Sequence, residues 1–131
     1  MLRYPWSQAR AALERLSAQR PELDCVQISY VNPETGTDAQ NILGYYALML
    51  RPGQTLTLPV RSPACVFHLI EGAAEVTIEA SSFSLAQADT CCAPGFSAVT
   101  LHNRKTDAPA FFFMADETPL HRKLGVYEVR G

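Results

Sequence analysis

The sequence offers few side chains that could hold a metal ion or attack a substrate. They are three histidines and four cysteines, namely His68, His102, His121, Cys25, Cys65, Cys91 and Cys92. Imidazole nitrogens and thiolates are common ligands of zinc and iron, so a metal centre is the first chemistry to consider. There is no Cys-x-x-Cys pair in the sequence, and a structural zinc site is therefore not indicated.

The cysteines do not form a recognisable nucleophile. A reactive thiol needs a neighbouring histidine or a helix N-terminus to lower its pKa, and the sequence supplies neither beside Cys91 or Cys92. Because strand side chains alternate, one of these two thiols should point into the fold and the other away from it. We interpret the cysteines as free thiols that pack as small hydrophobic side chains, as expected of a cytoplasmic protein.

Composition excludes several classes of partner. The chain has 131 residues, a hydrophobic fraction of 47% and a formal net charge of -2, which fits one globular domain. Its Lys and Arg residues are scattered, so neither nucleic acid nor an anionic membrane is expected as a partner. No apolar run approaches the roughly 20 residues of a membrane-spanning helix.

The first element expected is a helix within residues 1–22. Ser7 is the predicted N-cap, and Pro21 ends the helical pattern. Ala9, Leu13 and Leu16, together with Ala12, form an apolar stripe at helical spacing. This stripe should pack on the rest of the domain or on a neighbouring chain.

Residues 23–131 are predicted to form a single β domain. Short β-type runs recur between turn signals, and they are "VQISYV", "ILGYYALML", "TLTLPV", "CVFHLI", "EVTIE", "TCCA", "SAVTLHN" and "PAFFFMADE". The turn "NPETG" uses Pro33 and Gly36, and the tail is expected to hold a short helical turn and a last strand. The spacing predicts an all-β antiparallel fold, either closed or sandwiched, and the run Phe111 to Phe113 predicts a strand covered on both faces.

Two segments resemble the motifs of the cupin superfamily, whose fold is a double-stranded β-helix, or jelly-roll, barrel. "RPGQTLTLPVRSPACVFHLIEGAAEVTI" follows the frame of the first cupin motif, anchored on Glu71 and Gly72. "ADTCCAPGFSAVTLHN" follows the second, with Ala88 and Asp89 in place of Gly-Asp and with Asn103 at its end. The resemblance therefore implies a cupin-type barrel preceded by a short N-terminal helix.

The chain resembles, more narrowly, the C-terminal cupin half of the gentisate 1,2-dioxygenase family. "YPWSQARAALERL", "YVNPETG" and "HRKLGVYEV" carry this resemblance. In that family two cupins share one chain, and the N-terminal cupin holds the iron that opens the gentisate ring with oxygen. The resemblance implies that this chain corresponds to the other half.

The cupin frame places unsuitable residues at the metal-ligand positions. The two His positions of the first motif fall on Pro59 and Arg61, and its Glu position falls on Cys65. The last His position falls on Val99. Since proline and valine have no donor atom and arginine is a cation, we expect no metal cofactor. A register shift by one residue would bring His68 and His102 inward, but it would expose Phe67 and Leu101.

Three functions follow from these positions. The first is a non-catalytic cupin that serves assembly, as a homo-oligomer (a dimer is expected) or with a separate catalytic cupin. The second is a binding protein for a small aromatic carboxylate, with Arg61 as the anchor and Tyr45 or Phe67 against the ring. Its pocket would be lined by the degenerate ligand positions Pro59, Arg61, Cys65 and Val99. The third is an iron-dependent ring-cleaving dioxygenase that uses His68, His102 and a cysteine.

Overall fold

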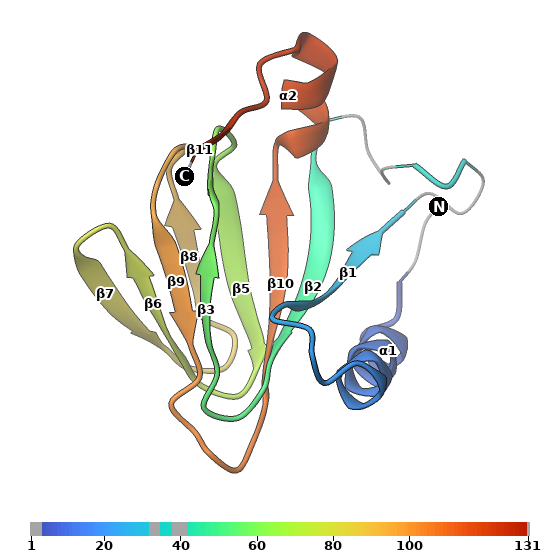
Figure 1. Cartoon of the computed structure of the whole chain (residues 1–131), viewed down its shortest axis with the longest axis vertical. Helices are drawn as coiled ribbons and strands as arrows, with labels where there is room; N and C mark the ends of the chain where they lie inside the picture. Colours follow the sequence, from blue (N-terminus) through green and yellow to red (C-terminus); the bar gives the residue numbers. More distant parts are fainter. Residues whose placement is uncertain (1–3, 32–34, 38–41, 131) are drawn as a thin grey trace.

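Two antiparallel sheets face each other and form a barrel (Figure 1). The computed structural model describes residues 4–31, 35–37 and 42–130. The large sheet has the strand order β1 (Val26–Tyr30), β2 (Gly44–Leu50), β10 (Ala110–Asp116), β5 (Cys65–Glu71) and β8 (Thr90–Ala93). The small sheet has the order β3 (Thr55–Leu58), β9 (Val99–His102), β6 (Ala74–Ile78) and β7 (Ser81–Leu85). A two-residue ribbon pairs β4 (Val60–Arg61) with β11 (Val129–Arg130).

The inner faces of the two sheets share one apolar core. Alternating residues of each strand point into it, as the period-two pattern predicts. On β5 these are Cys65, Phe67 and Leu69, while on β9 they are Val99 and Leu101. All five are buried, so the register inferred from the cupin frame is confirmed and the slipped register is wrong.

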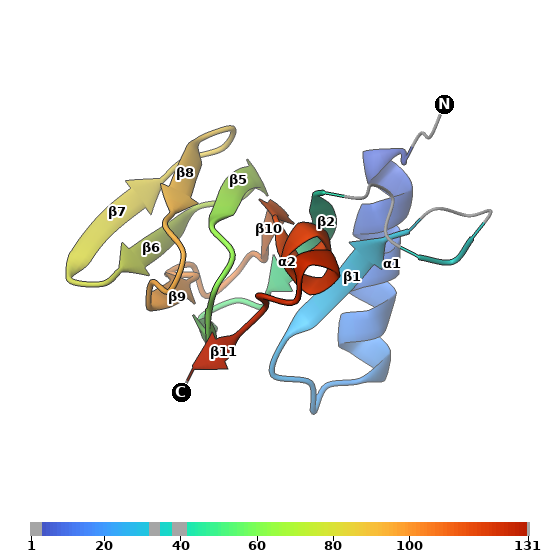
Figure 2. The ribbon, with the colours of Figure 1, turned by 90° about the horizontal axis from the view of Figure 1, so that it is seen from above.

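Helix α1 (Trp6–Gln19) covers part of the outer face of the large sheet (Figure 2). Its Leu13 is fully buried in a second cluster with Val26, Ala47, Met49 and Phe111, and Leu16 packs beside them. Phe112 points the other way, into the barrel core. The prediction that both faces of the Phe111–Phe113 strand are covered is thus confirmed, and the predicted helical stripe packs on the sheet.

The N-terminus of α1 differs from the prediction. Pro5, not Ser7, occupies the N-cap, and no side chain caps the helix. Pro5 has a φ of −59° and its carbonyl accepts the N–H groups of Gln8 and Ala9. Because the proline ring fixes φ near the helical value, Pro5 starts the helix two residues earlier than a cap at Ser7 would. Pro33, predicted in the first turn, lies outside the described residues.

Strand β7 was not predicted. Its sequence "SSFSL" contains three serines, which have little β propensity, and four of its five residues are exposed. Pairing with β6 from Ala74↔Leu85 to Ile78↔Ser81 makes it a strand at the edge of the small sheet. The predicted run "TLTLPV" is divided at Pro59 into β3 and β4, because proline cannot donate a ladder hydrogen bond.

The C-terminal segment has the two elements expected of it. Helix α2 (Thr118–Leu124) follows β10 directly and ends at Gly125, whose φ of 73° is the left-handed conformation that glycine adopts freely. Strand β11 then returns to pair with β4 at the same end of the barrel (Figure 1). Together, α2 and β11 lie over the end of the barrel where β10 finishes.

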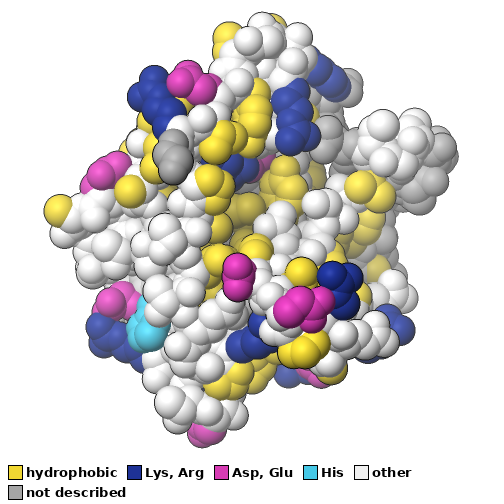
Figure 3. Space-filling model, viewed as in Figure 1, with side chains coloured by type: hydrophobic (Ala, Val, Ile, Leu, Met, Phe, Trp, Pro, Cys, Tyr) yellow, Lys and Arg dark blue, Asp and Glu magenta, His cyan; other side chains and the backbone are white. Residues whose placement is uncertain are grey.

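The surface carries mixed charge. On the face shown in Figure 3, basic and acidic side chains lie side by side among polar and apolar ones. The ion pairs Arg104–Glu75 and Arg10–Glu71 are examples of this mixing. In the part of the chain that the structure describes, neither helix is long and apolar enough to cross a membrane.

Candidate functional site

Five of the six predicted site residues line one small cavity at the α2 end of the barrel. They are Pro59, Arg61, Cys65, Phe67 and Val99. The cavity measures about 20 Å³, which is room for about one water molecule. Tyr45, the sixth residue, lies on the outer face of the large sheet, where its ring stacks on Phe113 with centroids 5.8 Å apart.

Arg61 is directed into this end of the barrel by the short strand β4. Pro59 and Pro63 bound the strand, and β11 pairs with it through Val129↔Arg61. The Arg61 side chain is only 16% exposed, and its Nη2 lies 3.0 Å from Oδ2 of Asp116. Nη2 also donates to the Cys65 Sγ at 3.2 Å, and Nη1 donates to Thr118 Oγ1 at 3.5 Å.

Asp116 belongs to the same cluster, although it was not among the predicted site residues. Its side chain is fully buried, and its Oδ1 accepts the Thr118 backbone N–H at 3.1 Å and the Tyr46 hydroxyl at 3.5 Å. Oδ2 accepts no hydrogen bond from the described residues, so its contact with Arg61 is an ion pair without hydrogen-bond geometry. The signal was available: Asp116 is in phase with the inward-facing Phe112 and Met114 of the same strand.

The electrostatics of this cluster are those of a cation beside a neutral thiol. Burial raises the pKa of Cys65, more than the adjacent Arg61 lowers it, so the thiol stays protonated at neutral pH. For Arg61, burial lowers the pKa, but Cys65, Asp116 and Tyr127 together raise it above its ordinary value. Since the thiol is protonated, Asp116 is the negative charge that Arg61 meets at neutral pH.

His68 and His102 lie away from the barrel interior. His68 Nδ1 is 2.8 Å from Thr90 Oγ1 on the large sheet, whereas His102 Nδ1 is 2.6 Å from Thr55 Oγ1 on the small one. Each imidazole is therefore paired with a cross-strand threonine on the outside of its own sheet. The outward direction predicted for both side chains is confirmed.

The residues at the cupin ligand positions do not fit a metal ion. Pro59 and Val99 have no side-chain donor atom, Arg61 is a cation, and Cys65 is a protonated thiol in an apolar wall. Across residues 4–31, 35–37 and 42–130, no three His, Cys, Asp or Glu side chains come together in a group that could hold a metal ion.

His121 of α2 is part of the fold and not a solvated side chain of the tail. It is only 19% exposed; its Nδ1 is 3.0 Å from Ser62 Oγ, and its Nε2 is 3.5 Å from a Glu117 carboxylate oxygen. Serine, histidine and glutamate in a row resemble a nucleophile, base and orienting acid. However, Ser62 Oγ accepts the Glu128 N–H and bounds none of the cavities described here, so the trio fastens α2 to the segment after β4.

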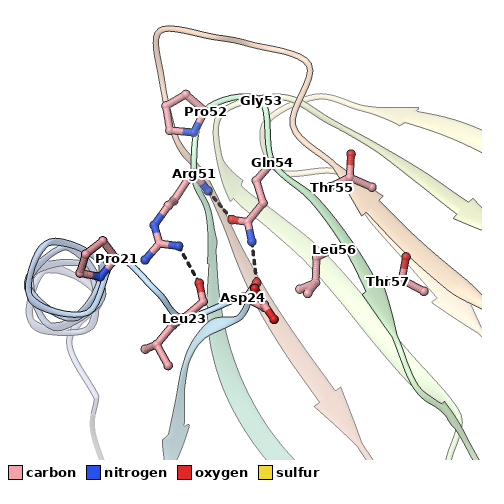
Figure 4. A pocket seen from close by; sticks show the side chains of 10 residues that line it. All are labelled: Pro21, Leu23, Asp24, Arg51, Pro52, Gly53, Gln54, Thr55, Leu56 and Thr57. Carbon is pink, nitrogen blue, oxygen red and sulfur yellow. Dashed lines mark hydrogen bonds between the residues drawn. The ribbon is translucent and has the colours of Figure 1, made fainter.

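A larger hollow, of about 570 Å³, lies at the opposite end of the barrel (Figure 4). Its cation, Arg51, donates to the backbone oxygens of Ser17, Arg20 and Leu23 and to the Ser17 hydroxyl. Gln54 accepts the Arg51 N–H and donates to the Asp24 carbonyl. The side-chain donors of Arg51 and Gln54 are thus bonded to the chain itself, and the bonds of Arg51 hold the C-terminal end of α1 against the barrel.

All four cysteines lie within the described residues and form no disulfide. Cys91 packs against the barrel core, whereas Cys92 is exposed on the outer face, which confirms their predicted alternation. Burial raises the pKa of both Cys25 and Cys91. These two half-buried thiols therefore have the character of small hydrophobic side chains.

Sequence comparison finds similarity to two 1,2-dioxygenases. The chain is 67% identical over all 131 residues to a gentisate 1,2-dioxygenase of Ralstonia sp, of which it covers 37%. It is 23% identical over 130 residues to a 5-aminosalicylate 1,2-dioxygenase of Comamonas sp, covering 34% of that protein. The chain thus spans little more than a third of the curated relatives it matches. No protein-family model matches the chain.

Comparison of structures identifies the fold. Salicylate 1,2-dioxygenase from Pseudoaminobacter salicylatoxidans aligns with 97% of this chain and 36% of its own, with a TM-score of 0.89 and 22% identity. A protein from Photorhabdus luminescens aligns with 77% of this chain and 86% of its own, at a TM-score of 0.64. The predicted cupin-type barrel with a short N-terminal helix is therefore confirmed. The chain is a cupin-fold domain that resembles, over its whole length, a part of gentisate 1,2-dioxygenase.

Proposed function

We propose that this chain is a non-catalytic cupin, equivalent to the C-terminal cupin half of gentisate 1,2-dioxygenase, that serves assembly with a catalytic cupin in the cytoplasm. The observation that carries the proposal is the Arg61–Asp116 ion pair, which closes the α2 end of the barrel around a cavity of about 20 Å³. A cation stands where the cupin frame requires a metal ligand. Ring cleavage would then belong to the remainder of the longer relatives.

The ligand-binding alternative has less support. A pocket for a small aromatic acid measures several hundred Å³, and the space beside Arg61 is more than tenfold smaller. Arg61 already pairs with an internal carboxylate, Asp116, in the way that it was expected to pair with a ligand. Tyr45, the proposed ring contact, is on the outside of the sheet.

An apolar groove on the outer face of the large sheet supports assembly. It measures about 390 Å³ and lies beyond the part of the sheet that α1 covers. Its lining includes Leu43, Ala64, Val66, Cys92 and Ala115. Val66 is 39% exposed there, on a strand that is otherwise well packed. We propose that a second cupin barrel packs on this outer groove, since contiguous exposed apolar surface marks interaction sites.

The first experiment measures iron content and oxygen consumption with gentisate. Protein expressed with added iron should contain far less than one iron per chain and should not consume oxygen. The double variant H68A/H102A is the matched control, and its iron content should equal that of the wild type. Near-stoichiometric iron that is lost in H68A/H102A would contradict the proposal and support the dioxygenase alternative.

Assembly is tested by sedimentation with two matched charge substitutions. Val66 in the outer groove and Phe83 on β7 are both exposed hydrophobic residues, at 39% and 47%. If the wild-type chain self-associates, V66E should weaken that association at least tenfold, whereas F83E should leave it unchanged. With a co-expressed catalytic cupin, V66E should likewise lower co-purification. Association that F83E disrupts and V66E does not would place the interface elsewhere.

A further inference from the structure

Asp116 raises a physical question that assembly does not answer. A carboxylate with a fully buried side chain is costly unless a cation accompanies it, yet its Oδ2 receives no hydrogen bond from the described residues. The nearest cation is Arg61, whose Nη2 lies 3.0 Å from that oxygen. The stability of this end of the barrel therefore depends on a positive charge beside Asp116.

The groups around that charge converge from separate elements. β10 supplies Asp116, β5 supplies the Cys65 sulfur at 3.2 Å, and α2 supplies the Thr118 hydroxyl at 3.5 Å. A carboxylate, a sulfur and a hydroxyl are acceptors, and no second cation is among these contacts of Arg61. An arrangement of acceptors around one positive group is the layout of a cation-binding site.

We infer that Asp116, Cys65 and Thr118 form a cation-binding site inside the barrel, and that the Arg61 guanidinium is the cation built into it. Arg61 falls on a position where the cupin frame has a metal ligand. Its guanidinium therefore replaces that ligand and also supplies the positive charge that a metal ion would bring. A planar guanidinium suits the site because two separate nitrogens donate to two separate acceptors, Nη2 to the Cys65 sulfur and Nη1 to the Thr118 hydroxyl, whereas an ammonium group has all its donors on one nitrogen. The inference stands whether or not the chain assembles with a partner.

If this inference is right, the guanidinium can be removed from the site by mutation and replaced by a free guanidinium ion from solution. Arg61→Ala removes the guanidinium and leaves both the Asp116 carboxylate and the space that the side chain filled. A free alkylguanidinium ion should bind there, because it restores the charge and the donors to Sγ and Oγ1. The matched control is R61A/D116N, which keeps the space but removes the negative charge.

The test is thermal unfolding of the full chain with ethylguanidinium chloride. We expect R61A to unfold about 10 °C below the wild type, as for a buried charge that loses its partner. Ethylguanidinium at about ten times its Kd should raise the Tm of R61A by about 5 °C. Equal ethylammonium chloride should not raise it, and neither wild type nor R61A/D116N should respond to ethylguanidinium.

Several results would overturn the inference. They are an R61A variant as stable as the wild type, equal rescue by ethylammonium, or equal rescue of R61A/D116N. If R61A does not fold, the comparison moves to R61M, D116L and R61M/D116L. The double variant should then have a higher Tm than either single variant, because it buries no unpaired charge. A double variant with the summed loss of the two single variants would also overturn the inference.

Discussion

Two partly buried arginines hold the two ends of the barrel in different ways. Arg51, beyond the Leu50↔Ala110 pair, donates to three backbone carbonyls and one hydroxyl of the α1 region. Arg61, beside the opposite end of β10, pairs with the buried carboxylate of Asp116. The acceptors of Arg51 are neutral groups that can accept hydrogen bonds from water if the guanidinium is removed. The fully buried Asp116 carboxylate has no such access to water. Two arginines with a similar number of contacts can therefore contribute very different amounts to the free energy of unfolding.

The difference between the two ends is tested most directly by removing each guanidinium in turn. R61M should lower the free energy of unfolding by about 3–5 kcal/mol, because it leaves a buried carboxylate without its cation. R51M should lower it by about 2 kcal/mol, because only hydrogen bonds between a charged donor and neutral acceptors are lost. Urea unfolding of the two variants measures both. Equal losses, or a greater loss in R51M, would remove the distinction between the two ends.

A smaller effect at the Arg61 end concerns alkaline pH. Burial raises the pKa of Cys65 above its ordinary value of 9.0, so in the unfolded chain this thiol loses its proton at a lower pH than in the folded protein. Its contribution to stability is therefore complete below pH 9 and is lost as pH rises through the raised folded-state pKa. The loss is at most about 1.4 kcal/mol per pH unit for this thiol.

The matched variants for this effect are C65A and C92A. Urea unfolding between pH 8 and 10.5 should show a flatter pH dependence for C65A than for the wild type. C92A removes an exposed thiol outside the Arg61 cluster, and its slope should stay closer to that of the wild type than the slope of C65A does. If the free energy of unfolding changed with pH equally in the wild type and in C65A, Cys65 would have the same pKa in the folded and unfolded chain, which would contradict the prediction.

Much of the fold could be predicted because periodicity and turn residues determine it locally. The inward positions of Phe67 and Leu101 followed from alternation, and Gly72 marked a tight turn. The structure explains that glycine, because a Cβ there would lie 2.9 Å from the Pro109 carbonyl oxygen and its φ is +97°. Strand β7 could not be predicted, since its serines become a strand only by pairing with β6.

The residues at the cupin ligand positions could be predicted to lie together, but the carboxylate that pairs with Arg61 could not. The cupin frame brought Pro59, Arg61 and Val99 together because strand register alone fixes which residues face inward. The inward phase of Asp116 could be read from β10, but its contact with Arg61, about 55 residues earlier in the chain, depends on how the two segments pack and could not be predicted. Likewise, the position of His121 depends on where α2 packs, and no local pattern in the tail reports that packing.

The place of β10 in the large sheet has a consequence for the order in which the chain folds. β10 lies between β2 and β5, and without it the large sheet separates into the pairs β1–β2 and β5–β8. When a chain is synthesised from its N-terminus, the residues of four of the sheet's five strands therefore precede residue 110, and they can form only two separate strand pairs until β10 is made. Joining the two pairs closes long loops, which costs conformational entropy. Only the contacts that β10 makes with β2 and β5 offset this cost. Folding of the large sheet should thus be completed only after residues 110–116 have been synthesised, and apolar strand faces stay exposed until then.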